Sequence, residues 1–424
     1  MAKPDAPHPF TFRDYRAYWI GRLASTVATT SMVVIIGWQV YDIARRTMPL
    51  REAALQLGLI GVAQFLPLAL LTLIVGWTAD RLDRRWIARS TALLEALCAG
   101  TLAWLAWHGT TTLADLFAIA ALLGVARAFA GPALGALAPN LVPAAVLPTA
   151  IAVSSIAWQS GSIAGPALGG YLYAAHSWLP YLVACILFLT AFTMLMLIRP
   201  IIVPRIAGNA HPFRQMVDGL HYVRRNRMVL GAISLDLFAV LLGGATAMLP
   251  VYARDVLHIG ASGLGHLRAA PAIGSTLTAI LLGVRPIRTH VGVKMLAAVV
   301  VFGAATIGFG LSHSVPLSLV FLAVLGSADM ISVFVRQSLI QLYTPNEMRG
   351  RVGAVSSLFI SGSNELGEAE SGFVASLIGP VAAVALGGIG AVGVTLLWAW
   401  LFPELRRAKN FDPPILEPQE EQRP

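Results

Sequence analysis

The stretch Gly76-Trp77-Thr78-Ala79-Asp80-Arg81-Leu82-Asp83-Arg84-Arg85 decides how this chain folds. Five of its residues are charged and lie within six positions, directly after an apolar run of about twenty residues. A second apolar run begins only a few residues later. This pattern indicates a helix that leaves a membrane, a tight charged turn and a helix that enters again. Because arginine is enriched in cytoplasmic loops, we expect the turn to lie in the cytoplasm.

The composition of the chain indicates an integral membrane protein. Its 424 residues are 57% hydrophobic and only 12% charged, about half the charge of a soluble protein. The net charge of +9 comes mostly from arginines on one set of loops, so we do not expect nucleic-acid binding. Cys98 and Cys185 stand alone in apolar runs and no nucleotide-binding loop occurs, so we expect no metal and no cofactor.

Apolar runs predict twelve membrane spans and therefore an all-α fold. The spans cover about residues 18–43, 53–77, 88–108, 113–134, 147–174, 178–198, 228–252, 262–284, 292–311, 315–340, 354–378 and 381–402. With both termini in the cytoplasm, most arginines and lysines fall on cytoplasmic segments. Arg45, Arg46 and Arg51, in the first outside loop, are an exception that the sequence does not explain.

A polar segment divides the chain into two halves. We predict a cytoplasmic N-terminus at 1–17, a six-helix bundle at 18–198, a cytoplasmic linker at 199–227, a second six-helix bundle at 228–402 and a cytoplasmic tail at 403–424. The halves are repeats, because glycines recur in them at constant offsets. The matching pairs are Gly58 with Gly265, Gly76 with Gly283, Gly165 with Gly367, and Gly170 with Gly372. Such repeats are typical of transporters that bind substrate between two halves.

Three motifs of the N-terminal half resemble those of the major facilitator superfamily. The opening stretch resembles the loop pattern G-x-x-x-D-R-x-G-R-R, with Asp83 in place of the second Gly. Residues 123–131 resemble the drug/proton antiporter pattern L-x-x-x-R-x-x-Q-G, with Ala130 in place of Gln. Residues 161–170 resemble the antiporter pattern G-x-x-x-G-P-x-x-G-G. The resemblance implies two pseudo-symmetric six-helix bundles and an exporter that exchanges its substrate for protons.

Two of these motifs suggest sites. In the loop we expect a gating site, where an acid that bridges to arginines locks one conformer. Its residues are Gly76, Asp80, Arg81, Arg84 and Arg85. In the fifth span we expect a helix-packing site, because proline bends a helix and glycines allow close contact. Its residues are Gly161, Gly165, Pro166, Gly169 and Gly170.

The C-terminal half resembles a narrower group, the bacterial efflux proteins that include the enterobactin exporter. The residues that carry this resemblance are Leu235-Asp236-Leu237-Phe238, Leu249-Pro250-Val251-Tyr252, Leu267-Arg268-Ala269-Ala270-Pro271, Arg349-Gly350-Arg351-Val352 and Asn364-Glu365-Leu366-Gly367-Glu368. It extends over nearly the whole chain and implies a class of transport rather than one substrate.

Charged residues within the predicted spans are candidates for proton coupling or substrate binding, because each costs about 2.5–3.5 kcal/mol to insert. The site candidates are Arg127, Asp236, Arg268, Asp329, Glu365 and Glu368, and Glu95 and Glu370 are further buried charges. Arg336 lies near the cytoplasmic end of its span and is expected to extend to the membrane surface. The alternative role for each charge is an ion pair that only stabilises the bundle.

Three of these expectations concern geometry. Asp236 has no cation within one turn of its own helix, so we expect it to be buried without a local partner and to bind a proton or a cationic group. Arg127 and Asp329 occupy equivalent repeat positions, so we expect them to face each other across the central cavity. Glu365 and Glu368 share one helical face, so one of them should hold a proton.

The sequence therefore predicts a monomeric major facilitator exporter in a bacterial inner membrane, with protons and a small amphiphilic, siderophore or drug-like molecule as its substrates. Uptake by proton symport is an alternative that the antiporter motifs disfavour. A transport-inactive sensor or scaffold is an alternative of another class. A membrane-embedded enzyme is not expected, because neither cysteine has a histidine on a neighbouring turn and no H-E-x-x-H motif occurs.

Overall fold

The computed structural model describes residues 7–81, 83–137, 140–143, 146–200, 212–285, 287–345 and 348–411. Inside its helices, the side chains of residues 72–81, 136, 148, 152, 212–215, 361 and 365 lie outside this description. The described residues form helices joined by turns, with no strand among them. The predicted all-α fold is therefore confirmed.

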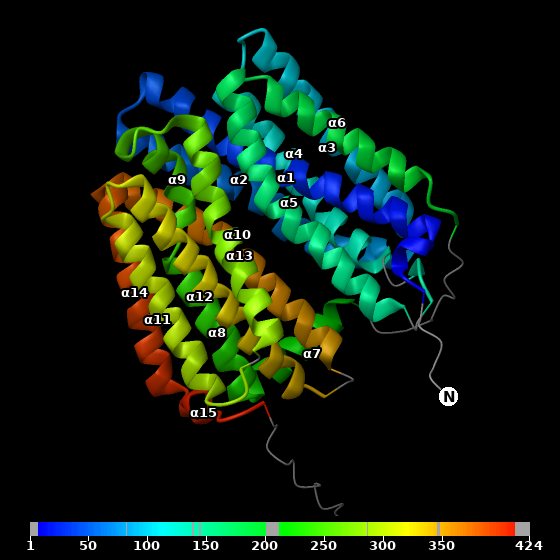
Figure 1. Ribbon diagram of the computed structural model, residues 1–424, viewed down its shortest axis with the longest axis vertical. Helices are drawn as coiled ribbons and strands as arrows, with labels where there is room; N and C mark the ends of the chain where they lie inside the picture. The colour runs from blue at the N-terminus through cyan, green and yellow to red at the C-terminus, as the bar shows by residue number, and fades with distance from the viewer. Residues whose placement is uncertain are drawn as a thin grey trace, which may run out of the picture.

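Six long helices form an N-terminal bundle (Figure 1). They are α1 (Arg13–Thr47), α2 (Leu50–Arg81), α3 (Arg84–Trp107), α4 (Leu113–Leu137), α5 (Leu147–Ala175) and α6 (Leu179–Met196), and the short η1 (Pro9–Thr11) precedes them. The C-terminal bundle contains α8 (Arg227–Leu242), η3 (Ala245–Met248), α9 (Leu249–Val251), η4 (Tyr252–Val256), α10 (Gly260–Val284), α11 (Val291–Gly310), α12 (Val315–Leu342), α13 (Arg349–Ile378) and α14 (Pro380–Leu401). Two short helices, α7 (Pro212–Arg225) and α15 (Pro403–Arg407), flank this bundle.

The predicted number of twelve spans is not confirmed. Within the described residues, 10 segments are long and apolar enough to cross a membrane, one of which runs from α8 through η4. The helices α5 and α13 have 29 and 30 residues and are long enough, but they are not among these apolar segments. Both contain many small and polar residues, and both lie where the two bundles meet, so a part of their surface is covered by protein instead of lipid.

The first span of the C-terminal bundle is broken near its middle. α8 ends at Leu242, before Gly243 and Gly244. The span then continues through the 3-10 helix η3, the short α-helix α9 and the π-helix η4. A Cβ atom at Gly244 would lie 2.7 Å from the Gly367 carbonyl oxygen of α13. The break therefore lets α13, which contains the predicted acids, approach this span closely.

The hydrophobic cores show how the two bundles are arranged. One core contains buried residues of both bundles, including Tyr41 and Leu102 from the first and Tyr252 and Leu264 from the second. Two further cores belong to one bundle each. The bundles thus share a core over part of their length and have separate cores elsewhere, and Figure 1 shows them meeting at one end and diverging toward the other.

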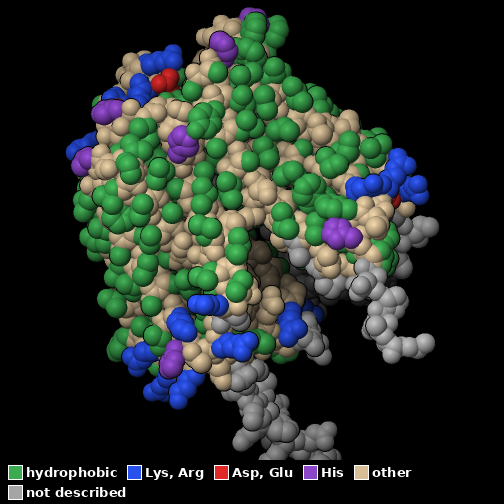
Figure 2. Space-filling view, in the orientation of Figure 1, with side chains coloured by type: hydrophobic (Ala, Val, Ile, Leu, Met, Phe, Trp, Pro, Cys, Tyr) green, Lys and Arg blue, Asp and Glu red, His purple; other side chains and the backbone are tan. Residues whose placement is uncertain are grey.

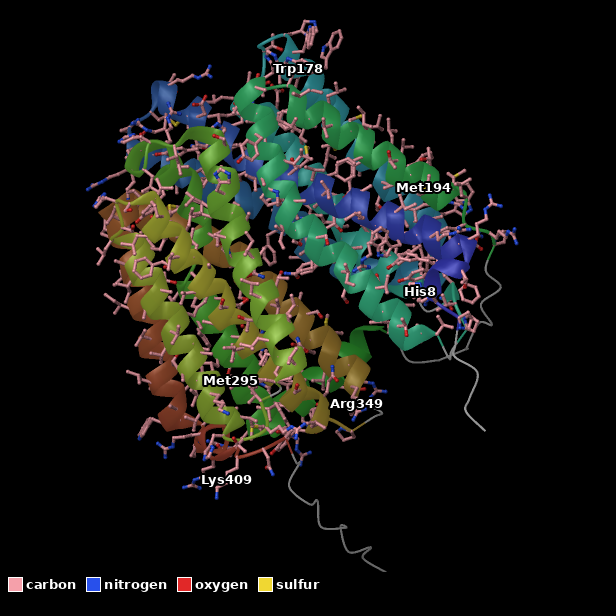
Figure 3. All side chains as sticks on the ribbon, viewed as in Figure 1. His8, Trp178, Met194, Met295, Arg349 and Lys409 are labelled. Atoms are coloured by element: carbon pink, nitrogen blue, oxygen red, sulfur yellow. The ribbon has the colours of Figure 1, made fainter. Side chains whose placement is uncertain are left out.

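We name the two ends by their elements. The linker end has η1, α7 and α15, and Arg349 and Lys409 lie there in Figure 3. The opposite end has the α1–α2 turn and η4, and Trp178 marks it in the N-terminal bundle. Figure 2 shows a hollow between the bundles that opens at the linker end, with Lys and Arg side chains around its rim.

Candidate functional site

A small pocket inside the N-terminal bundle brings Glu95 and Arg127 together. α3 contributes Glu95, α4 contributes Arg127, and α2 contributes Gln64. Glu95 is only 3% exposed, and Arg127 Nη1 donates a hydrogen bond to Gln64 Oε1 at 3.2 Å. Most of the remaining wall is apolar and comes from α1, α4 and α6. Because few other groups can solvate it there, the Glu95 carboxyl depends electrostatically on Arg127.

A second pocket, inside the C-terminal bundle, contains Asp236 and Asp329. Its lining comes from α8, α11 and α12. Asp236 Oδ1 forms an ion pair with Arg336 Nη1 of α12, and these side chains are 9% and 4% exposed. Asp236 is buried without a local partner on its own helix, but the expectation of an uncompensated acid is wrong, because Arg336 of another helix pairs with it. The expected extension of Arg336 to the membrane surface is also wrong, because its guanidinium turns inward to this acid.

The two pockets occupy equivalent places in the two repeats. Thr29 of the first pocket and Asp236 of the second are 207 positions apart, the offset that also relates the glycines of spans 2 and 8. Arg127 and Asp329 likewise line one pocket each. The structure therefore does not bring Arg127 and Asp329 together across the central hollow. It places a cation in one bundle and an acid at the matching position of the other.

Arg268 and Glu368 connect α10 to α13 within the C-terminal bundle. Arg268 Nη2 lies 3.9 Å from Glu368 Oε1, and the two side chains are 21% and 28% exposed. Arg268 Nε is buried and has no hydrogen-bond partner within the described part of the chain. This long ion pair leaves part of the guanidinium available to another group. Glu365 lies on the same helix, but its side chain is outside the described residues.

The charged turn after α2 is described only in part. α2 continues to Arg81, but the surroundings of Gly76 and the side chains of Asp80, the predicted acid of the gate, and Arg81 lie outside the description. Asp83, which departs from the family pattern, caps α3 by accepting a hydrogen bond from the Arg85 backbone N–H at 2.9 Å.

The described arginines near this turn act within the N-terminal bundle. Arg85 Nε lies 3.1 Å from Asp83 Oδ1, and Arg85 Nη1 donates a hydrogen bond to the Ile198 carbonyl. Arg89 donates hydrogen bonds to the carbonyl of Leu195, in the last turn of α6, and to that of Ile198, just after the helix ends. Cations at the C-terminal end of a helix satisfy its free carbonyls and its dipole. Arg84 is half-buried at the start of α3.

The glycines of α5 lie between α1 and α10. Cβ atoms at Gly161 and Gly169 would lie 2.7 Å from Thr26 Cγ2 and 2.5 Å from Ser31 Oγ of α1. Gly165, midway between them, faces Thr30 in the same way. Gly170 and Pro166 instead contact α10, near Gly265. Because three glycines at intervals of four share one face, α1 can pack directly on the α5 backbone.

Two glycine pairs join the bundles. A Cβ at Gly58 of α2 would lie 2.9 Å from Gly372 Cα of α13, and a Cβ at Gly170 of α5 would lie 3.1 Å from Gly265 Cα of α10. Gly58 and Gly265 are repeat partners, and so are Gly170 and Gly372. The two contacts are therefore the same contact made twice, each time between the second span of one repeat and the fifth span of the other.

Sequence reasoning missed a charged network at the opposite end. Arg254 Nη1 lies 2.7 Å from Asp42 Oδ1, and Tyr41 donates a hydrogen bond to Asp255 Oδ2 at 2.5 Å. Arg45 Nη2 lies 3.5 Å from Asp255 Oδ1. Each of two adjacent residues in η4 thus contacts the end of α1, across the boundary between the bundles. The unexplained arginines of the first outside loop were the signal that could have revealed it.

Comparison with known proteins identifies the chain. Residues 5–420 match the family model described as transmembrane secretion effector. The chain belongs to this family of the major facilitator superfamily. The chain is 27% identical to the enterobactin exporter of Citrobacter koseri over 407 residues, which cover 95% of the chain and 94% of the relative. It is 26% identical to an enterobactin exporter of Escherichia coli, over the same shares of both chains.

Solved structures of other transporters have the same fold. The D-xylose–proton symporter superposes with a TM-score of 0.72 at 14% identity, covering 94% of this chain and 99% of that one. A bacterial homologue of the human lysosomal transporter Spinster, in an inward-facing and occupied conformation, gives 0.68 at 14% identity, covering 95% and 97%. The family match and the similarity to the exporters, together with this fold, show that the chain is a multi-pass membrane transport protein for small molecules and not an enzyme.

A large groove lies at the linker end, outside the two bundle pockets. It has a volume of about 1730 Å³ and is lined by α7, α8, α15 and the ends of α12 and α13. Four of its charged residues form two ion pairs: Arg227 Nε lies 2.8 Å from Glu404 Oε1, and Arg351 Nη1 lies 3.3 Å from Asp218 Oδ2. These pairs hold α7 and α15 against the bundle.

Proposed function

We propose that this transporter exports a small amphiphilic molecule, siderophore-like or drug-like, across the bacterial inner membrane in exchange for protons. The observation that carries this proposal is the similarity to enterobactin exporters over 95% of the chain. The fold supports it, because two bundles around a hollow provide a path for substrate. The charges buried within the bundles supply groups that can bind protons.

We propose that the linker end faces the cytoplasm. The basic side chains around its rim support this orientation through the positive-inside rule. The hollow would then be open to the cytoplasm and closed toward the periplasm by the two glycine contacts and the charged network at the opposite end. In this conformer an exporter can bind its substrate from the cytoplasm.

Transport would follow from rocking of the N-terminal bundle on the C-terminal bundle. The shared core and the α2–α13 and α5–α10 contacts form the boundary along which the bundles move. Because the hollow lies between two bundles of one chain, we propose that a monomer is the working unit. The loop after α2 would close the cytoplasmic side in the other conformer, with Asp80 bridging to an arginine.

Flux in reconstituted vesicles tests the proposed function. The full-length protein is placed in liposomes with labelled enterobactin outside, and a pH gradient of either sign is imposed. Exchange for protons predicts that label accumulates when the lumen is acidic, and that a protonophore abolishes the accumulation. Accumulation only with an alkaline lumen would show symport, and no accumulation with either gradient would exclude enterobactin as a substrate.

A further inference from the structure

We propose that Glu95 is a proton-binding residue of this transporter, and that Arg127 and Gln64 are the groups that position and tune it. This site rests on the proposed proton-coupled function and deepens it. It lies in the core of the N-terminal bundle, away from the C-terminal acids that the sequence emphasises. Nothing in the sequence motifs assigns a role to Glu95, because its neighbours come from other helices.

The geometry of the pocket points to a ligand as small as a proton or a hydrated proton. Glu95, Gln64 and Arg127 face a common cavity of about 10 Å³, which matches the space needed by a single water molecule. No larger substrate fits. The neighbouring guanidinium also disfavours a metal cation, because two positive charges would share this poorly solvated space.

Glu95 differs in its pairing from Asp236 and Glu368, the acids of the C-terminal bundle that have an arginine close by. Asp236 has Arg336 and Glu368 has Arg268 within 4.0 Å. In the described part of the chain, Glu95 has no cation within that distance, although Arg127 lines the same pocket. At 3% exposure a lone carboxylate is strongly destabilised, so the acid can gain or lose a proton without breaking an ion pair.

The groups that face Glu95 define how its proton can be controlled. Arg127 comes from α4, while α1, α2 and α6 contribute uncharged side chains such as Thr29, Gln64 and Phe188. On its own helix, Cys98 is the neighbouring titratable group. Among the described residues that line the pocket, Arg127 is therefore the charge that sets proton affinity. Any movement of α4 against α3 during transport would change that affinity, which links the proton to the motion of the bundle.

Infrared pH titration of the full-length protein in liposomes tests the site, with the proton itself as the probe. Wild type should show a protonated-carboxyl band that bleaches reversibly as pH rises and that is missing in Glu95→Gln. Arg127→Gln should bind this proton about tenfold more tightly, because a nearby cation shifts a carboxyl midpoint by one unit or more. Glu52→Gln, at an exposed acid at the start of α2, is the matched control and should keep the band.

Two outcomes would overturn the proposal. One is a Glu95→Gln spectrum that superposes on wild type at every pH. The other is a midpoint that does not move in Arg127→Gln. Glu95→Asp provides a second variant, which should retain a carboxyl band with a displaced midpoint if the pocket remains folded.

Flux measurements separate this proposal from the proposed function. Gradient-driven accumulation of enterobactin should be about tenfold lower in Glu95→Gln than in wild type. The variant should still exchange labelled for unlabelled enterobactin across the membrane. If the band assigns to Glu95 but the wild type moves no enterobactin, the transport proposal fails alone. If the wild type transports and the variant accumulates normally, only the role of Glu95 fails.

Discussion

Asp83 both caps α3 and pairs with Arg85, and substitutions can separate these two roles. It caps α3, and the hydrogen bonds from the Arg85 side chain hold the pKa of the Asp83 carboxyl below its usual range. A lowered pKa in the folded state stabilises the protein above about pH 4, and the stabilisation is lost as pH falls through the folded-state pKa.

We expect Asp83→Ala to lower the free energy of unfolding by about 1 kcal/mol at pH 7, the usual cost of a lost cap. Asp83→Asn should retain most of the cap and lose only the ion pair. Thermal unfolding in detergent at pH 7 and pH 3 measures both variants. The difference between wild type and Asp83→Asn should shrink at pH 3, and a difference that grows as pH falls would contradict the assigned pair.

A second prediction for single residues concerns the buried ion pair of Asp236 and Arg336. Removing one partner leaves a buried charge without compensation, which costs about 3–5 kcal/mol. Asp236→Asn or Arg336→Gln should therefore lower the unfolding temperature strongly, while the double variant should recover part of the loss. A double-mutant cycle by thermal unfolding checks this, and additive single effects would show that the pair contributes no coupling.

The sequence could predict the nature of these residues but not their partners. Burial of Asp236 follows from its place in an apolar run, yet Arg336 is a hundred positions away. The comparison of the repeats matched Arg127 to Asp329, and the two residues do line corresponding pockets. Residues at corresponding repeat positions lie in different bundles, however, so the match does not place them in contact. Glu95 was recognised only as a buried charge, since its pocket is built from five helices.

At the scale of helices, the glycine contacts between the bundles set how closely the opposite end can close. A Cβ at Gly372 would lie 2.5 Å from Gly58 Cα, whereas a Cβ at Gly362 of the same helix would meet only Phe65 Cζ at 3.8 Å. Gly372→Ala should therefore push α2 and α13 apart and favour the conformer that is open at the opposite end. Gly362→Ala should not.

Accessibility of the hollow measures this effect. We expect a cysteine placed in the hollow to react more slowly from the linker end in Gly372→Ala, by about threefold to tenfold, and at the wild-type rate in Gly362→Ala. Equal rates in all three proteins would show that the glycine contact does not control closure. Motif spacing predicted glycines for close packing in α5, but only the structure shows which neighbour each one meets.

At the scale of the whole molecule, two bundles share a core toward one end and separate toward the other. Apolar runs and internal repeats predicted the all-α architecture, because both signals are local and strong. The conformer could not be predicted, because one sequence has to support states open to either side. Their balance depends on contacts between bundles such as Asp42 with Arg254, which sequence spacing does not reveal.

The charged network at the opposite end contributes to that balance. Its ion pairs are partly exposed, so we expect about 1 kcal/mol from each and about a thirtyfold shift in the ratio of the two conformers when both are removed. Arg254→Glu should favour opening at that end by repelling Asp42. Combining it with Asp42→Lys should restore part of the closure.

Distance measurements between spin labels at both ends test the central claim, that the bundles alternate between two openings. After Cys98 and Cys185 are replaced by serine, one label pair is placed at Arg51 and His313 of the opposite end and another at Arg16 and Lys409 of the linker end, all exposed. Arg254→Glu is predicted to lengthen the first distance and shorten the second in the same population of molecules. Distances that both lengthen, or that do not change at either end, would contradict alternating access through this boundary.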